Sequence, residues 1–340
     1  MAIRRRSSRS YDLNTSPFFR LERKRDLAKL LGISLSELSR LVREREQYYI
    51  FRSELIGTKI RDLAIPVRSL RRCHDRLLTL LRRIRLPDHI RCPKKGSSPI
   101  QNALTHVGQG SITTADIKDF YPSTTEEHVF RFFRYKMEMS DDCARILARL
   151  CTVRNGLPVG SPVSPHLASL THLDIFDDAA DLANRIGNQL TVWVDDVSYS
   201  GKTHRRDLIS AIRRSATSKG FGVHKLQRGG RGRTVEITGT ALRKGRADVA
   251  NASNLKLKDV LDEFRSQSDP VAKLLAGNKA LGILRHHRQL RRLAGRRTEG
   301  EEARIRWIRR EIEAVVVELN SRPQLTTNVA LLPDVQDSPF

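Results

Sequence analysis

The sequence predicts an α+β fold in which an antiparallel sheet with helices is followed by a helical C-terminal region. Three observations predict it: the buried-strand pattern SITTADI at 111–117, the hairpin-like alternation on both sides of Asp195-Asp196, and helical apolar spacing over 254–319. With 340 residues, 39% of them hydrophobic, the chain can bury a sizeable core. This excludes a small disulfide-stapled fold and a mainly disordered chain.

The elements expected before the first buried strand form an N-terminal helical region. Ser34 is expected to cap a helix, with Glu37 completing a capping box, and the apolar stripe of LAKLLGISLSELSRL at 27–41 is typical of a helix-turn-helix. In order, we expect a flexible basic arm (1–19), two helices split at Gly32-Ile33-Ser34 (20–47), an extended segment turning near Gly57 (48–68) and a basic helix (69–86).

The elements expected after 111–117 alternate between helices and short strands. Ser164 followed by Pro165 is a good N-cap and first-turn pair for a helix. In order, we expect a helix (126–153), a Gly/Pro loop (156–165), a helix (166–186), a hairpin (189–201), a basic helix (205–219), a strand (235–242), a helical region (254–319) and a disordered tail (321–340).

The charge of the chain is strongly positive and unevenly distributed. The net charge is +24, made of +15 over residues 1–100, −5 over 101–200 and +14 over 201–340. Basic flanks of this kind are typical of a protein that binds a polyanion such as nucleic acid, and an acidic centre between them calls for a cation. A highly charged solvated surface is the alternative interpretation.

The spacing of the cysteines and the length of the apolar runs indicate the cellular compartment in which the protein functions. Its four cysteines form no C-x-x-C pair and have no zinc-type spacing, so we expect reduced thiols and a cytoplasmic location. No apolar run approaches the roughly 20 residues needed to span a bilayer, so we expect no membrane partner. The basic start lacks the apolar stretch of a secretory signal.

Three acidic residues are the strongest candidates for chemistry. Asp116 ends one predicted strand, and Asp195 and Asp196 lie at a hairpin turn that the same sheet can bring beside it. Because adjacent strand residues point to opposite faces, at most one of that pair need join Asp116. Such carboxylates suit two divalent cations, Mg²⁺ with Mn²⁺ as an alternative, for phosphoryl transfer.

The Asp195-Asp196 segment has two other interpretations. An Asp-Asp pair also favours a simple turn, and TVWVDD has the apolar-then-acidic pattern of a nucleotide-triphosphatase strand. The nearby SGKT at 200–203 fails as a phosphate-binding loop, because the first glycine of that motif falls on Asp196.

Three segments together resemble the palm motifs of reverse transcriptases, most closely the bacterial retron group and its antiphage relatives. They are ADIKDFYPST (115–124), GLPVGSPVSP (156–165) and VWVDDVSYSG (192–201), which stand in the order of the family's motifs A, B and C. The resemblance covers about residues 20–245. It implies a right-hand polymerase with N-terminal helices and fingers (20–110), a palm carrying the motifs (111–250) and a helical thumb (251–320).

The resemblance also implies roles for single residues. Asp116, Asp195 and Asp196 match the catalytic metal ligands. Tyr121 matches the bulky residue under the sugar, where a ring selects deoxynucleotides; a core aromatic is its alternative reading. The other residues expected at the nucleotide are Lys59, Arg61, Ile117, Asp119, Phe120 and Gly160, with Arg61 the match for a triphosphate-holding cation, or else a surface arginine.

Further segments also resemble parts of the family. GFGVHKLQ (220–227) resembles motif D, and Ile237-Thr238-Gly239 resembles the Val-Thr-Gly segment of retrons. RGGRGR (228–233) is read as an RNA contact or a hairpin loop. The residues expected at template and primer are Gly156, Pro158, Trp193, Thr238, Gly239, Arg288, Arg291 and Arg292; a solvated helix face is the alternative for the arginines.

Several positions depart from the family pattern. Val159 stands where motif B has Gln, and Trp193 where motif C has Tyr. In motif D, His224 replaces Asn and Leu226-Gln227 occupies the region of a later Lys, so His224, Lys225 or Arg228 is the candidate general acid. Because none of these departures touches the metal ligands, we expect an active enzyme.

The first functional hypothesis is an RNA-directed DNA polymerase. The resemblance implies that it uses dNTPs to copy its own structured noncoding RNA into a hybrid RNA–DNA product, in antiphage defence with a separate effector protein. A higher-order oligomer with that effector is an open option. The alternatives are a non-retron antiphage reverse transcriptase making protein-primed or untemplated DNA, and a helix-turn-helix DNA-binding regulator based on 27–41.

Overall fold

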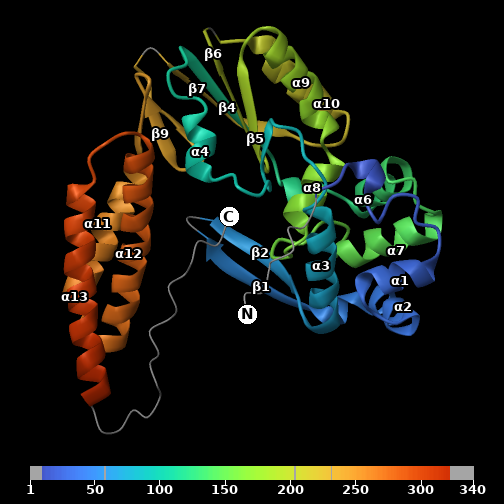
Figure 1. The fold of residues 1–340 in the computed structure, drawn as a ribbon, viewed down its shortest axis with the longest axis horizontal. Coiled ribbons are helices and arrows are strands. Elements are labelled where there is room, and N and C mark those ends of the chain that lie inside the picture. The colour runs from blue at the N-terminus through green and yellow to red at the C-terminus, as the bar shows by residue number, and fades with distance from the viewer. Residues whose placement is uncertain (1–9, 57–58, 203, 231, 322–340) are drawn as a thin grey trace, which may run out of the picture. The chain divides into compact units, whose positions relative to one another are not determined.

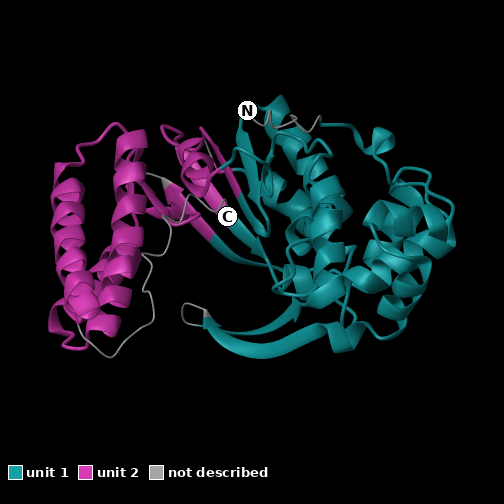
Figure 2. Ribbon diagram, turned by 60° about the horizontal axis from the view of Figure 1, so that its bottom comes forward, with its two compact units in different colours: residues 1–97, 115–197, 205–226 teal, residues 98–114, 198–204, 227–340 magenta. Residues whose placement is uncertain are grey.

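The computed structural model describes residues 10–56, 59–202, 204–230 and 232–321, and within them the chain forms two compact units (Figure 2). The first unit takes in the chain up to residue 97 together with 115–197 and 205–226, and the second takes in 98–114, 198–204 and the chain from 227 onward. Both helices and strands build the structure, which confirms the predicted α+β class.

A five-stranded sheet carries the motifs singled out from the sequence. Its strand order is β3-β5-β6-β4-β7. The short β3 was not predicted, because three residues are too few to show an alternating pattern, and it pairs parallel to β5. The strands are β3 (Ile90–Cys92), β4 (Ser111–Ile117), β5 (Gln189–Trp193), β6 (Asp196–Gly201) and β7 (Val223–Gly230).

Six of the seven residues of β4 are buried, which explains why SITTADI reads as a nearly continuous run of apolar and small residues. The strand places Asp116 one residue before its end. The predicted hairpin at 189–201 is confirmed as β5 and β6, joined by Val194 and Asp195.

The N-terminal helices form as predicted. Gly32 adopts a left-handed conformation (φ 75°) between them, where a side chain would be strained, and Ser34 accepts a hydrogen bond from the Glu37 backbone N–H. Their apolar side chains are buried, Leu27, Leu31, Leu38 and Leu41 among them. The helices are α1 (Lys24–Leu31) and α2 (Leu35–Arg43).

The described part of the expected basic arm is packed. The Tyr11 hydroxyl donates to the Leu80 carbonyl over 2.6 Å, and the Phe18 side chain is fully buried. A short 3-10 turn, η1 (Leu13–Thr15), lies between them. Residues 1–9 of the arm lie outside the described residues.

Residues 49–56 and 59–66 form an extended two-stranded ribbon, visible in blue in Figure 1. After the 3-10 turn η2 (Arg45–Tyr48), β1 (Tyr49–Ile56) pairs antiparallel with β2 (Lys59–Pro66), so that Glu54 stands opposite Arg61. The turn predicted near Gly57 lies outside the described residues. The next helix, α3 (Arg68–Leu81), buries Leu70, Leu77 and Leu80, as its apolar stripe predicts.

Two helices predicted as continuous are divided, and that part of the prediction is wrong. The segment 126–153 becomes α6 (Glu126–Arg131), a π-helical turn η3 (Phe132–Lys136) and α7 (Asp141–Cys151), because Ser140 caps a new helix start at the Cys143 N–H. The segment 166–186 becomes α8 (Ser164–Thr171) and α9 (Asp174–Arg185).

The predicted cap at Ser164 is also wrong. Val163 is the N-cap residue, and the Ser164 hydroxyl instead donates to the Pro158 carbonyl over 2.9 Å. The basic helix predicted at 205–219 is confirmed as α10 (Arg206–Thr217), and the short α5 (Phe120–Ser123) follows β4.

The second unit combines a three-stranded sheet with three long helices. The strand predicted at 235–242 is instead a hairpin, because Thr238 (φ 45°) and Gly239 (φ 79°) form its turn. The sheet order is β10-β9-β8, with β8 (Val235–Ile237), β9 (Thr240–Arg243) and β10 (Arg246–Val249); α4 (Pro99–Leu104) contacts β8 and β9.

The three long helices pack side by side through an apolar core (Figure 1). A side chain at Gly277 would meet Phe264 and Ile312, so this glycine allows the helices to approach closely. They are α11 (Asn251–Ser266), α12 (Pro270–Leu293) and α13 (Glu299–Ser321). The predicted tail lies outside the described residues, apart from Ser321, which ends α13. Among the described residues, no helix is both long enough and apolar enough to cross a membrane.

Candidate active site

The turn between β5 and β6 presents two aspartates. Val194 has a positive φ of 62°, a conformation that costs a β-branched residue free energy. Asp195 follows it in the turn, and Asp196 begins β6. The Asp195 carbonyl accepts the Ile117 backbone N–H over 2.9 Å, which fixes the turn against the end of β4.

This arrangement gathers all three candidate carboxylates. One carboxylate oxygen from each of Asp116, Asp195 and Asp196 lies within 4.8 Å of the others. The expectation that only one of the adjacent pair need approach Asp116 assumed strand geometry. Because Asp195 lies in the turn, the alternation of strand side chains does not separate it from Asp196.

The electrostatics of the cluster favour a bound cation. Asp116 is 8% exposed. Burial, followed by repulsion from Asp116, raises the pKa of Asp195 to about 6. Burial, followed by repulsion from Asp195 and Asp116, raises the pKa of Asp196 to about 7. Asp195 and Asp196 thus resist ionisation beside Asp116, and a nearby positive charge stabilises their ionised form.

Lys225 of β7 supplies part of that charge, and His224 of the same strand lies beside it. His224 Nδ1 lies 2.8 Å from Asp116 Oδ2, and Lys225 Nζ lies 3.0 Å from the same oxygen. The contact with Asp116 raises the pKa of Lys225. The Lys118 backbone N–H also donates to the Gly222 carbonyl over 2.8 Å, holding the segment before β7 beside the end of β4. Two of the three candidate substitutes in motif D, His224 and Lys225, therefore lie at the cluster.

The cluster fits a divalent metal site. Its three side chains offer hard oxygen ligands, the donors that Mg²⁺ and Mn²⁺ take in proteins, and their geometry keeps several oxygens within one coordination sphere. Within the described residues it is the one group of His, Cys, Asp and Glu side chains with this spacing. The predicted grouping of the three aspartates is present; the identity of the ion is part of the proposal below.

Tyr121 lies within electrostatic range of the cluster. Burial, and after it the charge of Asp195, raises the pKa of the Tyr121 phenol. Asp119 (φ 48°) is the N-cap residue of α5 and is exposed, whereas the Phe120 ring is buried against His172 and Phe221. Of the two, only Asp119 presents its side chain to solvent.

The candidates on β2 and β4 differ in their exposure. Arg61 is exposed and lowers the pKa of Asp195 through space, which places its charge near the cluster. Lys59 is exposed at the start of β2. Ile117 is 1% exposed, so only its backbone can serve a nucleotide.

The Gly/Pro loop at 156–165 holds three candidates in different surroundings. A Cβ at Gly156 would clash with the Pro122 backbone, so this glycine allows the loop to approach α5. Pro158 is buried. Gly160 is exposed and has a φ of 113°, and its Cα lies against β2 at Ala64 and Ile65.

The remaining candidates are distributed over both units. Trp193 ends β5 in the first unit, opposite Cys92 of β3. In the second unit, the Thr238 hydroxyl donates to the Pro99 carbonyl over 2.7 Å, with Gly239 beside it in the turn. Arg291 lies 2.7 Å from the buried Glu301. Arg288 and Arg292 are exposed on α12.

Comparison with known proteins supports the resemblance seen in the motifs. The retron Ec86 reverse transcriptase of Escherichia coli is 27% identical over 185 residues, covering 53% of this chain and 58% of the relative. The retron Se72 reverse transcriptase of Salmonella heidelberg (strain 579083-10) is 28% identical over 180 residues, which cover 51% of this chain and 47% of the relative. The chain thus spans about half the length of these curated relatives. The predicted resemblance to retron reverse transcriptases is confirmed.

A solved structure of a foamy viral protease–reverse transcriptase in complex with double-stranded DNA covers 82% of this chain and 46% of its own, with 14% identity and a TM-score of 0.41. No protein-family model matches the chain.

Proposed function

We propose that this protein is an RNA-directed DNA polymerase of the retron type. The observation that carries the proposal is the cluster of Asp116, Asp195 and Asp196, which come from the first and the third of the three segments that resemble reverse-transcriptase motifs. The similarity to retron reverse transcriptases supports it independently of the geometry.

The residues divide the reaction between them. Asp116, Asp195 and Asp196 hold two Mg²⁺ ions, with Mn²⁺ as an alternative. When bound, such ions lower the pKa of an attacking hydroxyl and neutralise a leaving pyrophosphate. Arg61 holds the triphosphate through its guanidinium. The Tyr121 ring fills the space under the sugar, and Lys225 or His224 can carry a proton beside Asp116.

The architecture extends this assignment to the rest of the chain. We assign the fingers to 20–110, the palm to 111–250 and the thumb to 251–320. The long helices α11–α13 support the last assignment, since α12 carries the exposed Arg288 and Arg292, whose charge suits a nucleic-acid backbone.

The biological part of the proposal rests on the resemblance of the motifs to those of retron reverse transcriptases. The template is a structured noncoding RNA copied into a hybrid RNA–DNA in the cytoplasm, and the product acts in antiphage defence with a separate effector protein. The net charge of +24 supports nucleic acid as the partner.

The test is to purify the protein from cells carrying its native flanking DNA and to sequence the bound nucleic acid. The control is Asp195→Ala with Asp196→Ala. We expect a short DNA joined to a structured RNA, absent from the control. Homopolymeric or protein-linked DNA would instead indicate a non-retron reverse transcriptase. Sequence-specific duplex binding that is equal in both proteins would favour a DNA-binding regulator using α1 and α2.

A further inference from the structure

The Gly/Pro loop braces two elements that carry candidate nucleotide-binding residues. On one side, the Val159 carbonyl accepts the Ala64 backbone N–H over 2.8 Å, which ties the loop to β2, the strand of Arg61. On the other side, the Leu157 backbone N–H donates to the Tyr121 carbonyl over 3.1 Å. The position of this loop therefore sets where Arg61 and Tyr121 stand.

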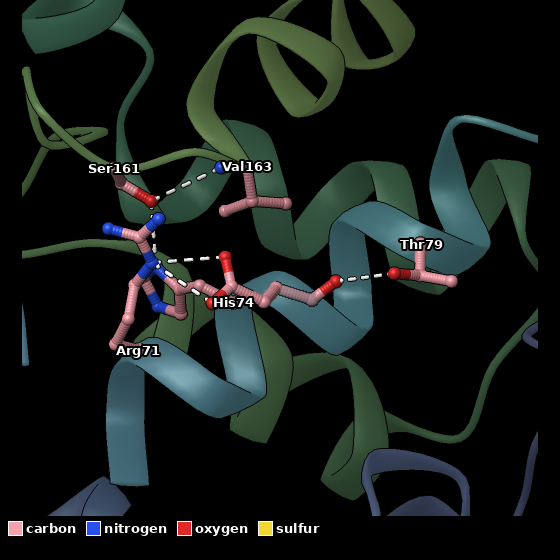
Figure 3. A network of polar contacts seen from close by, with 6 residues as sticks. Arg71, His74, Thr79, Ser161 and Val163 are labelled. Carbon is pink, nitrogen blue, oxygen red and sulfur yellow. Dashed lines mark hydrogen bonds and ion pairs between the residues drawn. The ribbon is translucent and has the colours of Figure 1, made fainter. Parts of the chain in front are cut away.

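The buried side chain of His74 forms a hydrogen bond with the loop. His74 of α3 is fully buried, and its Nδ1 lies 2.7 Å from the hydroxyl of Ser161, the residue after Gly160. Its Nε2 lies 2.8 Å from the Leu150 carbonyl near the end of α7. Figure 3 shows Ser161 and Val163 on the loop above the helix that carries His74 and Thr79. One ring thus links the loop to α3 and α7.

The chemistry of the three groups fixes the direction of each hydrogen bond. A carbonyl can only accept, so Nε2 of the neutral ring carries the hydrogen and donates to Leu150. Nδ1 is then an acceptor, and the Ser161 hydroxyl donates to it. Ser161 Oγ in turn accepts the Val163 backbone N–H over 3.3 Å. Each member has a defined role, so the network holds the loop in one conformation.

We propose that His74 is a positioning residue that holds the Gly/Pro loop through Ser161 and so sets the affinity and sugar selectivity for the incoming nucleotide. The inference rests on the proposed polymerase function. It goes beyond that function, because His74 and Ser161 are not members of the aspartate cluster, and their effect reaches the nucleotide through the loop that carries Gly160 and through Arg61 and Tyr121.

The primary test is Ser161→Ala, which keeps the ring and its bond to Leu150 but leaves a buried nitrogen without a donor. We expect the KM for dNTPs to rise about tenfold with kcat changed less than about threefold, and discrimination against ribonucleotides to fall. The matched control is Thr79→Ala, which removes a hydrogen bond from Thr79 Oγ1 to the Asp75 carbonyl on the same helix. It should leave KM and selectivity unchanged.

The second test changes His74, the other partner in the hydrogen bond to Ser161. In His74→Gln, the amide nitrogen can take the place of Nε2 and donate to Leu150, but the amide oxygen is not at the position of Nδ1. Ser161 then loses its acceptor, so the same rise in KM is expected. The KM of the double variant, Ser161→Ala with His74→Gln, should be no higher than that of either single variant, because each change removes the same hydrogen bond between His74 and Ser161. Additive effects, unchanged KM values, or a loss confined to kcat would overturn the proposal.

Equilibrium binding separates this inference from the proposed function. Titration calorimetry of dTTP with Mg²⁺ measures nucleotide affinity without any synthesis. If the parent protein binds dTTP but makes no DNA, and Ser161→Ala weakens binding about tenfold, the positioning role stands and the polymerase proposal fails. If Ser161→Ala and the parent bind dTTP equally, the positioning role fails whatever the polymerase activity.

Discussion

Lys225 Nζ and His224 Nδ1 both approach a single oxygen, Oδ2 of Asp116, at 3.0 and 2.8 Å. The ammonium of Lys225 and the imidazole of His224 thus contact the same oxygen of Asp116, the carboxylate that the motif A resemblance assigns to a metal. A divalent cation at Asp116 must either share this oxygen with them or displace them. We therefore expect the pair to affect how readily the cluster takes up metal.

Lys225→Met should tighten metal binding. Removing a positive charge beside the site lowers the repulsion felt by the entering ion, and we expect the apparent Mg²⁺ dissociation constant to fall about fivefold at low salt. Isothermal titration with MgCl₂ measures it. Lys219→Met is the matched control, since Lys219 pairs with Asp174 instead. Weaker Mg²⁺ binding in Lys225→Met would show that Lys225 holds Asp116 in its binding geometry.

Tyr121 should select deoxynucleotides by the bulk of its ring. Tyr121→Ala is expected to raise incorporation of ribonucleotides at least about tenfold, because the space under the sugar opens to a 2′-hydroxyl. Tyr121→Phe keeps the ring and should keep the selectivity. The ratio of kcat/KM for dCTP and CTP measures the effect. Equal selectivity in Tyr121→Ala and the parent would assign the ring to the core alone.

Acid should destabilise the protein partly through His74. Burial lowers the pKa of His74 to about 4, below its ordinary value of 6.5. Between these values the unfolded state binds the proton and the folded state does not, so stability falls as the pH falls from 6.5 to 4. This shift corresponds to at most about 3 kcal/mol of unfolding free energy.

Urea unfolding at pH 7 and pH 5 measures this dependence in the parent and in His74→Gln. Glutamine does not titrate, so the variant should lose less stability on acidification than the parent. An identical loss in both proteins would mean that His74 is not the group that titrates.

Local sequence patterns predicted most of the elements and the cluster. Asp195 and Asp196 were placed at a hairpin turn because residues on both sides alternate, and β5 and β6 confirm it. The buried run before Asp116 likewise predicted β4. These signals are local, since each depends on side chains close together in the chain.

Of the features that were missed, some leave no mark on the apolar periodicity and others depend on tertiary contacts. The break after Arg131 comes from a π-helical turn and the cap at Ser140, neither of which interrupts the apolar periodicity. His74 reads as one more residue of a basic helix, because its partners Leu150 and Ser161 are 76 and 87 residues away. No spacing rule connects residues so far apart.

The most direct test of the account is primer extension on an RNA template with dNTPs and Mg²⁺, comparing the parent with Asp195→Asn. We expect the parent to synthesise DNA and the variant, folded by circular dichroism, to be at least about 100-fold slower, because a metal ligand is lost. Asp178→Asn, an exposed change outside the cluster, should match the parent. Equal synthesis by the parent and Asp195→Asn, or none by either, would contradict the assignment of this cluster to DNA synthesis.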